Sequence, residues 1–382
     1  MKYCPDDQCT SCMACADVCP FKAIEIYSDK LHVLKTKIND NLCRNCGLCS
    51  KVCPVLNPVK SFLPQKAYAL FSKNQDDRTM CSSGGVASTL YRYVLNQGGV
   101  VYGTTILGGY PRYIRITDEK DVDLLKGSKY VYCDPLGIYR QVENDLKESQ
   151  ICLFIGIPCN VAALRGYLRR EYDTLYCVDI VCHGTPPYSY LHQHLSNKID
   201  SSVDISNITF RGKRDFFLTV YGSKSEILYN KYMNEDAYYH AFEEELLAKD
   251  VCYRCSYANE KRMGDITIGD FWGVSKSALN GYKGKVSVAL INSSKGMGLF
   301  DNTCHLFIYE ERPIDEAIQG NSQLKYPIHK SKLRTRFESD IESGIDFNTA
   351  MINIGIANMV RGNALKNFLL KIPRIVVKLI TQ

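Results

Sequence analysis

Eight cysteines near the amino terminus repeat one spacing twice. Residues 9–20 have the pattern Cys-x2-Cys-x2-Cys-x3-Cys-Pro, and residues 43–54 have the same pattern. In bacterial two-cluster ferredoxins, the first three thiolates of such a run bind one iron–sulfur cube and the fourth binds the other. We therefore expect two [4Fe–4S] clusters. The first set of ligands is Cys9, Cys12, Cys15 and Cys53, and the second is Cys43, Cys46, Cys49 and Cys19.

Zinc is the alternative occupant of these cysteines, because it also takes four thiolates. Zinc ribbons pair two short Cys-x2-4-Cys knuckles, however, and the third cysteine and the Cys-Pro dipeptide of each run are not part of that signature. The spacing therefore favours clusters. Cys4 lies outside the repeat and is expected to be a spare thiol. Two adjacent cubes form a one-electron relay, so the rest of the chain should hold a redox partner site.

Four further cysteines stand where ligands are expected. Cys159 follows a Gly-Ile-Pro segment at the end of an apolar run, Cys182 precedes His-Gly at the end of another, and Cys252 and Cys255 form a Cys-x-x-Cys pair. Together they would close a four-thiolate site for a third [4Fe–4S] cluster or for zinc. The alternative is that the two single cysteines are small buried apolar residues. The spacing alone leaves both interpretations open.

Two small or basic segments are suited to phosphate. Ser82, Ser83, Gly84 and Gly85 lie between a predicted strand and a predicted helix, where backbone N–H groups and a helix N-terminus favour an anion. The segment that carries Lys126, Ser128 and Lys129 adds two cations beside a glycine, which suits phosphate or the anionic edge of a reduced flavin. A simple N-cap turn and a solvated basic turn are the respective alternatives.

The elements that must position these groups alternate between strands and helices. Short apolar runs predict strands, and apolar spacing of three to four residues predicts helices. The expected strands are 67–71, 98–106, 150–156, 176–182, 265–271 and 286–292, and the expected helices are 86–95, 158–170 and 237–249. Strands that feed helices through Gly/Pro turns indicate layered α/β architecture with some antiparallel pairing. The fold class is thus mixed α/β or α+β, with a small ferredoxin-like domain before a larger one.

The cysteine density and the composition divide the chain. Nine of the eighteen cysteines fall within residues 1–53. We expect a two-cluster domain at 1–60, a linker at 61–66, a large domain at 67–350 and a basic apolar tail at 351–382. In the tail, residues 361–382 carry five basic and no acidic side chains. A terminal helix packed on the body is expected, and contact with an anionic membrane surface is the alternative.

The overall composition excludes several classes of protein. Apolar residues make up 45% and charged residues 23%, which excludes extended disorder. No apolar run is long enough to predict a membrane span, and the N-terminus lacks the apolar segment of a signal peptide. We therefore expect a cytoplasmic protein, in which cysteines serve as ligands rather than disulfides. The net charge of +6 is spread along the chain, so nucleic acid is not an expected partner.

The large domain resembles the beta subunit of coenzyme F-420 hydrogenase/dehydrogenase, in the version with a fused N-terminal two-cluster module. The matching segments occur in the order of the family and are Cys81–Gly85, Lys126–Tyr130, Gly156–Cys159, Asp179–Gly184, Cys252–Cys255 and Arg262–Gly273. The chain departs from the family where Gly212 follows Phe-Arg in place of aspartate, and where a Lys-Gly-Lys sequence begins at Lys283. Both departures leave the identity of the substrate open.

The resemblance implies FAD in the large domain and a third cluster on Cys159, Cys182, Cys252 and Cys255. It also implies electron exchange with a two-electron substrate, which is coenzyme F-420 in some relatives and a chlorophyllide in ferredoxin-dependent relatives. The expected redox partner is ferredoxin or a reduced deazaflavin coenzyme, and a partner subunit is a further candidate. No catalytic acid or base is identifiable. The alternatives are a non-catalytic electron-delivery subunit, a reductase of another organic substrate, and a scaffold that keeps its clusters for folding alone.

Overall fold

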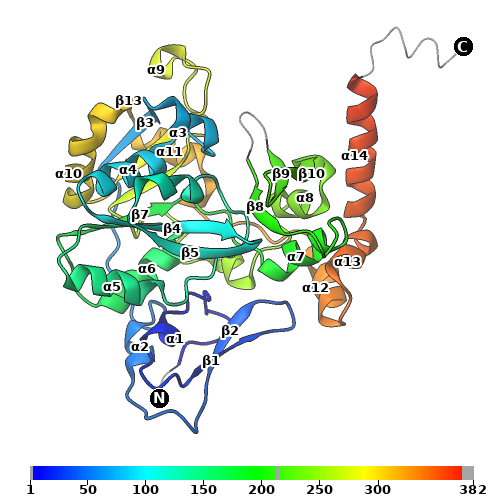
Figure 1. The fold of residues 1–382 in the computed structure, drawn as a ribbon, viewed down its shortest axis with the longest axis horizontal. Coiled ribbons are helices and arrows are strands. Elements are labelled where there is room, and N and C mark those ends of the chain that lie inside the picture. Colours follow the sequence, from blue (N-terminus) through cyan, green and yellow to red (C-terminus); the bar gives the residue numbers. More distant parts are fainter. Residues whose placement is uncertain (1–2, 212–215, 372–382) are drawn as a thin grey trace, which may run out of the picture.

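The computed structural model describes residues 3–211 and 216–371, and it consists of a small N-terminal module below a large sheet domain, with a third group of helices and strands beside it (Figure 1). The predicted fold class is confirmed, because a small cysteine-rich module precedes a mixed α/β sheet. The domain boundaries expected from the sequence stay predictions. Phe62, in the expected linker, exchanges two backbone hydrogen bonds with Arg262, of 2.9 and 2.7 Å.

The N-terminal module contains two short helices and one hairpin. Helices α1 (Ala14–Val18) and α2 (Leu48–Val52) each contain the third cysteine of one run and end before its Cys-Pro dipeptide. Strands β1 (Ile24–Ser28) and β2 (Leu34–Ile38) pair antiparallel between them, with Ile24 opposite Ile38. The two cysteine runs therefore lie in equivalent places of a repeated unit.

The large domain is built on an eight-stranded mixed sheet in the order β13-β3-β12-β11-β7-β6-β4-β5. Its middle strands β4, β6, β7 and β11 pair parallel, whereas the flanking pairs are antiparallel. The bounds are β3 (Lys66–Ser72), β4 (Val100–Leu107), β5 (Tyr110–Ile116), β6 (Cys152–Gly156), β7 (Leu175–Ile180), β11 (Ile266–Asp270), β12 (Ser287–Ile291) and β13 (Phe307–Arg312). All six strands expected from apolar runs are present within a few residues of their predicted bounds.

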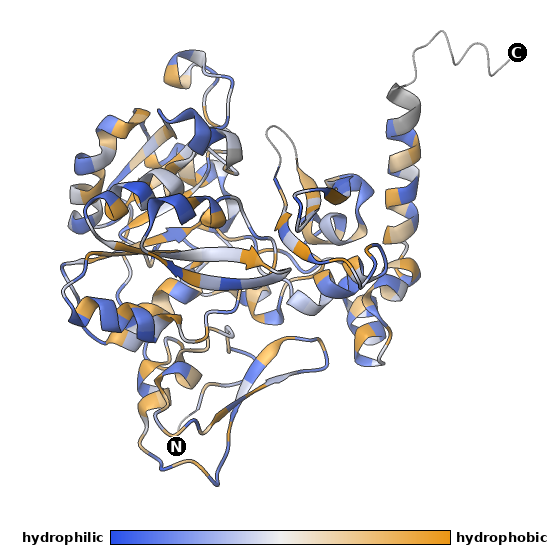
Figure 2. Ribbon diagram, in the orientation of Figure 1, coloured by the Kyte–Doolittle hydropathy of each residue, from blue (hydrophilic) through white to orange (hydrophobic). Residues whose placement is uncertain are grey.

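Helices cover both faces of this sheet. Alternate residues of β6 point to opposite sides, so Leu153 and Ile155 pack in one apolar cluster and Cys152 and Phe154 in another. One face is covered by α4 (Val86–Asn96) and α10 (Ser294–Thr303). The other is covered by α5 (Ile138–Lys147), α6 (Pro158–Leu168) and α11 (Ile314–Gly320). The outer helices carry hydrophilic and hydrophobic residues side by side (Figure 2).

The loops that carry the predicted site residues leave the same edge of the sheet. Strands β6, β7 and β11 are parallel, and β3 shares their direction because it is antiparallel to β12, which is antiparallel to β11. The segments after β3, β6, β7 and β11 therefore meet at the carboxyl edge, where open α/β sheets bind ligands. This topology brings the turn at 81–85 to the cysteines that follow β6 and β7.

The third group of elements shows one difference from the expectation. It contains a three-stranded sheet, β10-β9-β8, and five α-helices within the described residues. The bounds are α7 (Tyr188–Ser196), β8 (Ile205–Thr209), β9 (Phe217–Gly222), β10 (Ile227–Tyr232), α8 (Ala237–Glu243), α12 (Arg334–Glu342), α13 (Phe347–Asn353) and α14 (Ile356–Lys371). The helix expected at 237–249 was wrong beyond Glu243, because Glu245 has a left-handed φ of 55°. This turn buries the next residue, Leu246, completely.

The C-terminal helix α14 extends from this third group (Figure 1). It contacts α13 and α8, and Val360 is buried against the same apolar cluster as Met351. Of the expected tail at 351–382, residues 372–382 lie outside the described residues. No helix within 3–211 or 216–371 is long and apolar enough to cross a membrane.

Backbone carbonyl groups of the N-terminal module accept hydrogen bonds from side chains of the large domain. Tyr132 Oη donates to the Ser11 carbonyl at 2.6 Å, and Tyr139 Oη donates to the Cys12 carbonyl at 2.9 Å. Helix α6 approaches α2 closely, because a Cβ at Gly166 would lie 2.7 Å from the Val52 carbonyl oxygen. These contacts hold the first cysteine run directly on the body.

A buried ion pair joins β7 to the segment before β11. Arg262 Nη2 lies 3.2 Å from Asp179 Oδ2, and both residues are at most 1% exposed. The carboxylate also accepts the Met263 N–H at 3.0 Å. Cys182 follows β7, and Cys255 lies shortly before Arg262. The ion pair therefore fixes the distance between these two predicted ligands.

We expect Asp179→Asn to destabilise the protein strongly. Removing one partner of a buried ion pair leaves an uncompensated charge, which costs about 3–5 kcal/mol. Thermal unfolding followed by circular dichroism measures the effect. Glu25→Gln is the control, because its pair with Lys37 is exposed and screened by solvent. Equal melting temperatures for the two variants would contradict this role.

Candidate functional site

The two N-terminal cysteine runs share an unusual backbone conformation. Ser11 and Met13 have φ of 61° and 59°, and the equivalent Asn45 and Gly47 have φ of 51° and 75°. Positive φ is uncommon for residues other than glycine. Here it recurs at matching positions of both runs, where the chain curls between the cysteines. A backbone that curls twice around its own thiols is suited to wrapping a cube with three sulfur ligands.

The first predicted ligand set converges on one small cavity, which we call the N-terminal cavity. Cys9, Cys12, Cys15 and Cys53 line it together with Cys4. Side-chain hydrogen bonds with Cys4 lower the pKa of both Cys9 and Cys53 to about 6. Cys4 therefore lies within this group of thiols, and it is not separate from the cysteine repeat in space.

The second predicted set lies next to the first. Cys19 and Cys46 interact electrostatically with Cys49, whose thiol pKa is raised chiefly by burial. Cys43 stands in the same loop as Cys46, and Cys49 also lines the N-terminal cavity. The structure thus brings Cys19 from the first run to the cysteines of the second, as the crossed ferredoxin arrangement requires.

The four cysteines of the large domain also converge. Cys159, at the start of α6, and Cys182, after β7, line a second cavity with Cys252 and Cys255, which we call the middle cavity. Burial raises the pKa of the Cys159 thiol and brings that of Cys182 to about 12. Each of these two thiols interacts with Cys252 and Cys255. Gly184, with φ of 83°, directs the chain after Cys182, and a Cβ there would lie 3.5 Å from Cys252 Cβ.

Buried hydroxyl groups around these thiols are unsatisfied. Thr10 Oγ1, Ser11 Oγ and Thr185 Oγ1 have no hydrogen-bond partner among the described residues. Buried polar groups normally have partners, so these three atoms indicate room for an acceptor. The sulfur atoms of a cluster accept hydrogen bonds, and such bonds help to set its potential. In the described ranges, no three His, Cys, Asp or Glu side chains are grouped closely enough to hold a single metal ion.

A third cavity opens at the carboxyl edge of the sheet, and we call it the sheet-edge cavity. Ser82, Ser83, Gly85, Lys126, Ser128 and Lys129 line it, so six of the seven residues predicted for cofactor binding meet there. The seventh, Gly84, lies behind them. Its N–H donates to Ser287 Oγ at 2.9 Å, and a Cβ there would be 2.7 Å from the Leu70 carbonyl oxygen.

The N-terminus of α4 points to this cavity. Its N-cap Gly85 has φ of 86° and provides no side-chain cap, and Val86 and Ala87 line the cavity. The first N–H groups of a helix lack partners within the helix and carry a partial positive charge. A phosphate or pyrophosphate can accept from these groups without a cation.

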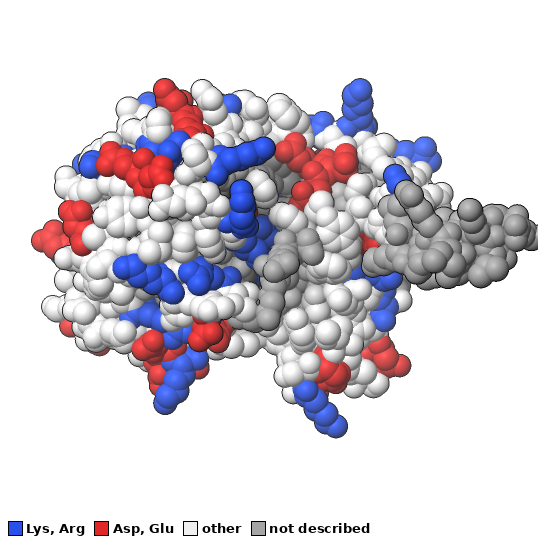
Figure 3. All heavy atoms as spheres, turned by 90° about the horizontal axis from the view of Figure 1, so that it is seen from above, with Lys and Arg blue, Asp and Glu red and all other residues white. Residues whose placement is uncertain are grey.

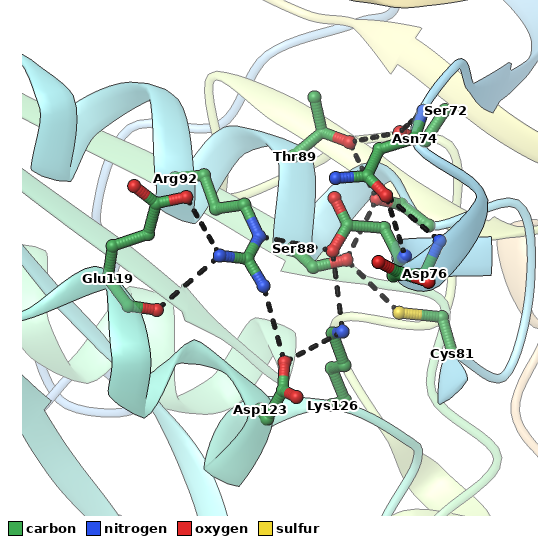
Figure 4. Close-up of polar contacts among 12 residues, drawn as sticks. Ser72, Asn74, Asp76, Cys81, Ser88, Thr89, Arg92, Glu119, Asp123 and Lys126 are labelled. Carbon is green, nitrogen blue, oxygen red and sulfur yellow. Dashed lines mark hydrogen bonds and ion pairs between the residues drawn. The ribbon is translucent and has the colours of Figure 1, made fainter. Parts of the chain in front are cut away.

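A network of charged side chains holds the loops around α4 (Figure 4). Arg92 pairs with Asp77, Glu119 and Asp123, at 3.2, 2.8 and 3.3 Å. Lys126 pairs with Asp123 at 2.7 Å and with Asp77 at 3.4 Å. The network therefore connects the segment after β3 to the segment that carries Lys126.

The two lysines predicted to contact the cofactor are engaged within the protein. The Lys126 side chain is 4% exposed and pairs with Asp77 and Asp123. Lys129 Nζ donates to the carbonyls of Leu125, Lys126 and Gly127 at 2.8–3.0 Å. Burial lowers the pKa of Lys129 to about 8. Both ammonium groups therefore stabilise the conformation of the loop at residues 125–129, and this loop lines the cavity.

The three cavities adjoin one another. Cys182, Gly184 and Thr185 line both the sheet-edge and the middle cavity. Thr10 and Pro54 line both the middle and the N-terminal cavity. Nine of the twelve predicted cysteine ligands and the α4 N-terminus thus line one continuous series of cavities, and the other three, Cys19, Cys43 and Cys46, line none of the three.

Aromatic and charged residues stand around the sheet-edge cavity. Arg211 donates to Asp270 at 2.9 Å and to Tyr130 Oη at 3.2 Å, and both of these partners line the cavity. Trp272 lines it too and is 46% exposed. The first departure from the family's sequence pattern is at Gly212, and residues 212 and 213 lie outside the described residues. On the face shown in Figure 3, Lys and Arg side chains gather toward the middle, with Asp and Glu around them.

Several residues of the site were not predicted from the sequence. Thr185 and Lys249, which line the middle cavity, belong to no matched motif, whereas Trp272 lies in the matched segment Arg262–Gly273 but was not predicted as a site residue. Cys4 could have been predicted as a residue of the site from its closeness to Cys9 in the sequence. For Lys249 no local signal exists, because its neighbours Thr10 and Tyr132 are distant in sequence.

Comparison with known proteins identifies families that two segments of the chain match. Residues 150–317 match the family model for the C terminus of the beta subunit of coenzyme F420 hydrogenase/dehydrogenase, and residues 8–57 match the model of a 4Fe-4S dicluster domain. These two matches confirm the resemblance predicted from the motifs. A chain in a structure of the F420-reducing [NiFe] hydrogenase complex from Methanosarcina barkeri, derivatized with xenon, is 15% identical, with a TM-score of 0.44. The match covers 72% of this chain and 93% of that chain. The search of curated proteins gave no match.

Proposed function

We propose that this chain, which joins a 4Fe-4S dicluster domain to the beta-subunit domain of the coenzyme F420 hydrogenase/dehydrogenase family, is an iron–sulfur flavoprotein oxidoreductase. It would move electrons between three [4Fe–4S] clusters and a two-electron organic substrate through FAD. One observation carries this proposal. Neighbouring cavities share lining residues, so the first and third cysteine sets and the α4 N-terminus lie along one continuous series of cavities, and Cys49 of the second set lines its N-terminal end.

The proposed cofactors have residues that fit them. Cys9, Cys12, Cys15 and Cys53 would hold the first cluster, and Cys19, Cys43, Cys46 and Cys49 the second. Cys159, Cys182, Cys252 and Cys255 would hold the third. FAD would place its pyrophosphate at the α4 N-terminus, beside Ser82, Ser83 and Gly85, with Lys126 and Lys129 positioning the opposite loop. When bound, FAD supplies the exchange between a two-electron hydride and single electrons.

The protein itself would perform three tasks in this reaction. The hydroxyls of Thr10 and Thr185 would donate to cluster sulfurs. The ion-pair network around Arg92 holds the anion-binding turn in place. Trp272 and Tyr130, at the sheet-edge cavity, would present a flat apolar surface to a ring-shaped substrate.

Turnover by the isolated chain tests this function. The protein, purified without oxygen and loaded with its cofactors, is mixed with reduced coenzyme F-420 and a viologen dye. We expect catalytic dye reduction, because a hydride donor and a one-electron acceptor then meet the two ends of the path. Reversible cluster reduction by dithionite without any turnover of the hydride donor would contradict the enzyme and indicate an electron-delivery role. Co-purification would then identify the partner protein that such a role requires.

A further inference from the structure

A buried lysine lies between the first and third predicted cluster sites. Lys249 is 4% exposed and lines the middle cavity, which contains all four cysteines of the third set. Its ammonium group donates to the carbonyl of Thr10 at 2.7 Å. Thr10 directly follows Cys9, a cysteine of the first set. The side chain thus spans the junction between the N-terminal module and the large domain.

The charge of Lys249 has no carboxylate partner within residues 3–211 and 216–371. The contacts of its ammonium group there are the Thr10 carbonyl and the face of the Tyr132 ring, whose centroid is 4.6 Å away. A buried cation is costly unless nearby groups stabilise it. For Arg262, a buried cation that also lines the middle cavity, the Asp179 carboxylate serves this purpose.

Cysteines of two predicted sets lie around Lys249. It lines the middle cavity together with Cys159, Cys182, Cys252 and Cys255, and its hydrogen bond to Thr10 places it beside Cys9 of the first set. A cluster bound by four thiolates carries net negative charge, and one-electron reduction adds to it. A nearby cation in a site that excludes water stabilises the reduced form and therefore raises the reduction potential.

We propose that Lys249 is a positioning residue of the electron path, whose positive charge raises the reduction potentials of the first and third clusters together. This inference rests on the proposed function. By acting on both clusters, one ammonium group shifts the two potentials in the same direction. The bond to the Thr10 carbonyl holds the charge at the junction.

Redox titration of the holoprotein, monitored by electron paramagnetic resonance, tests this role. Lys249→Gln removes the charge and keeps a donor for the Thr10 carbonyl, whereas Lys249→Arg keeps the charge. Lys295→Gln is the matched control, because Lys295 Nζ also donates to a backbone carbonyl, that of Tyr172, at 2.7 Å. We expect Lys249→Gln to make the potentials of two clusters more negative, with the remaining cluster and the iron content unchanged. Lys249→Arg and Lys295→Gln should match the unsubstituted protein.

Unchanged potentials in Lys249→Gln would overturn the inference, as would an equal shift in Lys295→Gln. Loss of iron from both Lys249→Gln and Lys249→Arg would also overturn it, since the side chain would then act through packing alone. Absence of cluster signals from the unsubstituted protein would instead contradict the proposed function. The two failures are therefore distinguishable.

Discussion

Cys159→Ala should remove about four of about twelve iron atoms per chain and leave the flavin in place. The expectation follows from the middle cavity, where Cys159 meets Cys182, Cys252 and Cys255. A cube that loses one of four thiolate ligands is exposed on one corner and is readily lost. Because this cluster would stand between the flavin and the N-terminal clusters, transfer of electrons between them should also slow sharply. Iron and sulfide analysis and rapid-mixing absorption spectroscopy measure the two effects.

Cys304→Ala is the control for this experiment. Cys304 is partly buried and its thiol donates to the Asp301 carbonyl at 3.4 Å, with no cysteine of the predicted sets around it. Its replacement should change neither the iron content nor the rate of electron transfer. A Cys159→Ala protein that retains about twelve iron atoms would show that Cys159 is a buried apolar residue, the alternative that its sequence position leaves open.

Gly85→Ala should abolish flavin binding while the iron content remains that of the unsubstituted protein. Gly85 is the N-cap of α4 and lines the sheet-edge cavity with φ of 86°. A side chain in the left-handed region costs about 1–2 kcal/mol. Its Cβ would also lie 3.3 Å from Ser72 Cβ, so the turn must shift. The shift moves the N–H groups that would hold the pyrophosphate. Flavin released by acid, relative to iron, measures the loss.

Gly98→Ala separates backbone strain from loss of the binding site. Gly98 follows the other end of α4 with φ of 73°, and a Cβ there meets no atom within 4 Å. Both variants should therefore lower the melting temperature, whereas only Gly85→Ala should lose flavin. Equal flavin content in the two proteins would mean that the α4 N-terminus does not hold the cofactor.

The local parts of the site could be predicted from the sequence. The thiols of each N-terminal run are close in the chain, so their spacing alone predicts the curled loops, and the structure shows them at Ser11 and Asn45. Cys159 and Cys182 end apolar runs that form parallel strands, and the ends of parallel strands meet at one edge. In these cases the geometry of a single strand or turn decides where the side chain lies.

The contacts between distant segments could not be predicted in the same way. Lys249 and Thr10 meet because the N-terminal module docks on the large domain, and nothing near either residue encodes that docking. The predicted helix at 237–249 fails for a related reason. Its sequence favours a longer helix, but burial of Leu246 in the core requires the turn at Glu245. Tertiary packing overrides local preference at such positions.

The most direct test of the account is to count iron, acid-labile sulfide and flavin in the protein purified without oxygen. The predicted result is about twelve iron atoms, a matching amount of sulfide and one FAD per chain, since the proposed cofactors are three cubes of four iron atoms each and one flavin. A colourless protein that contains zinc, without sulfide or flavin, would contradict it.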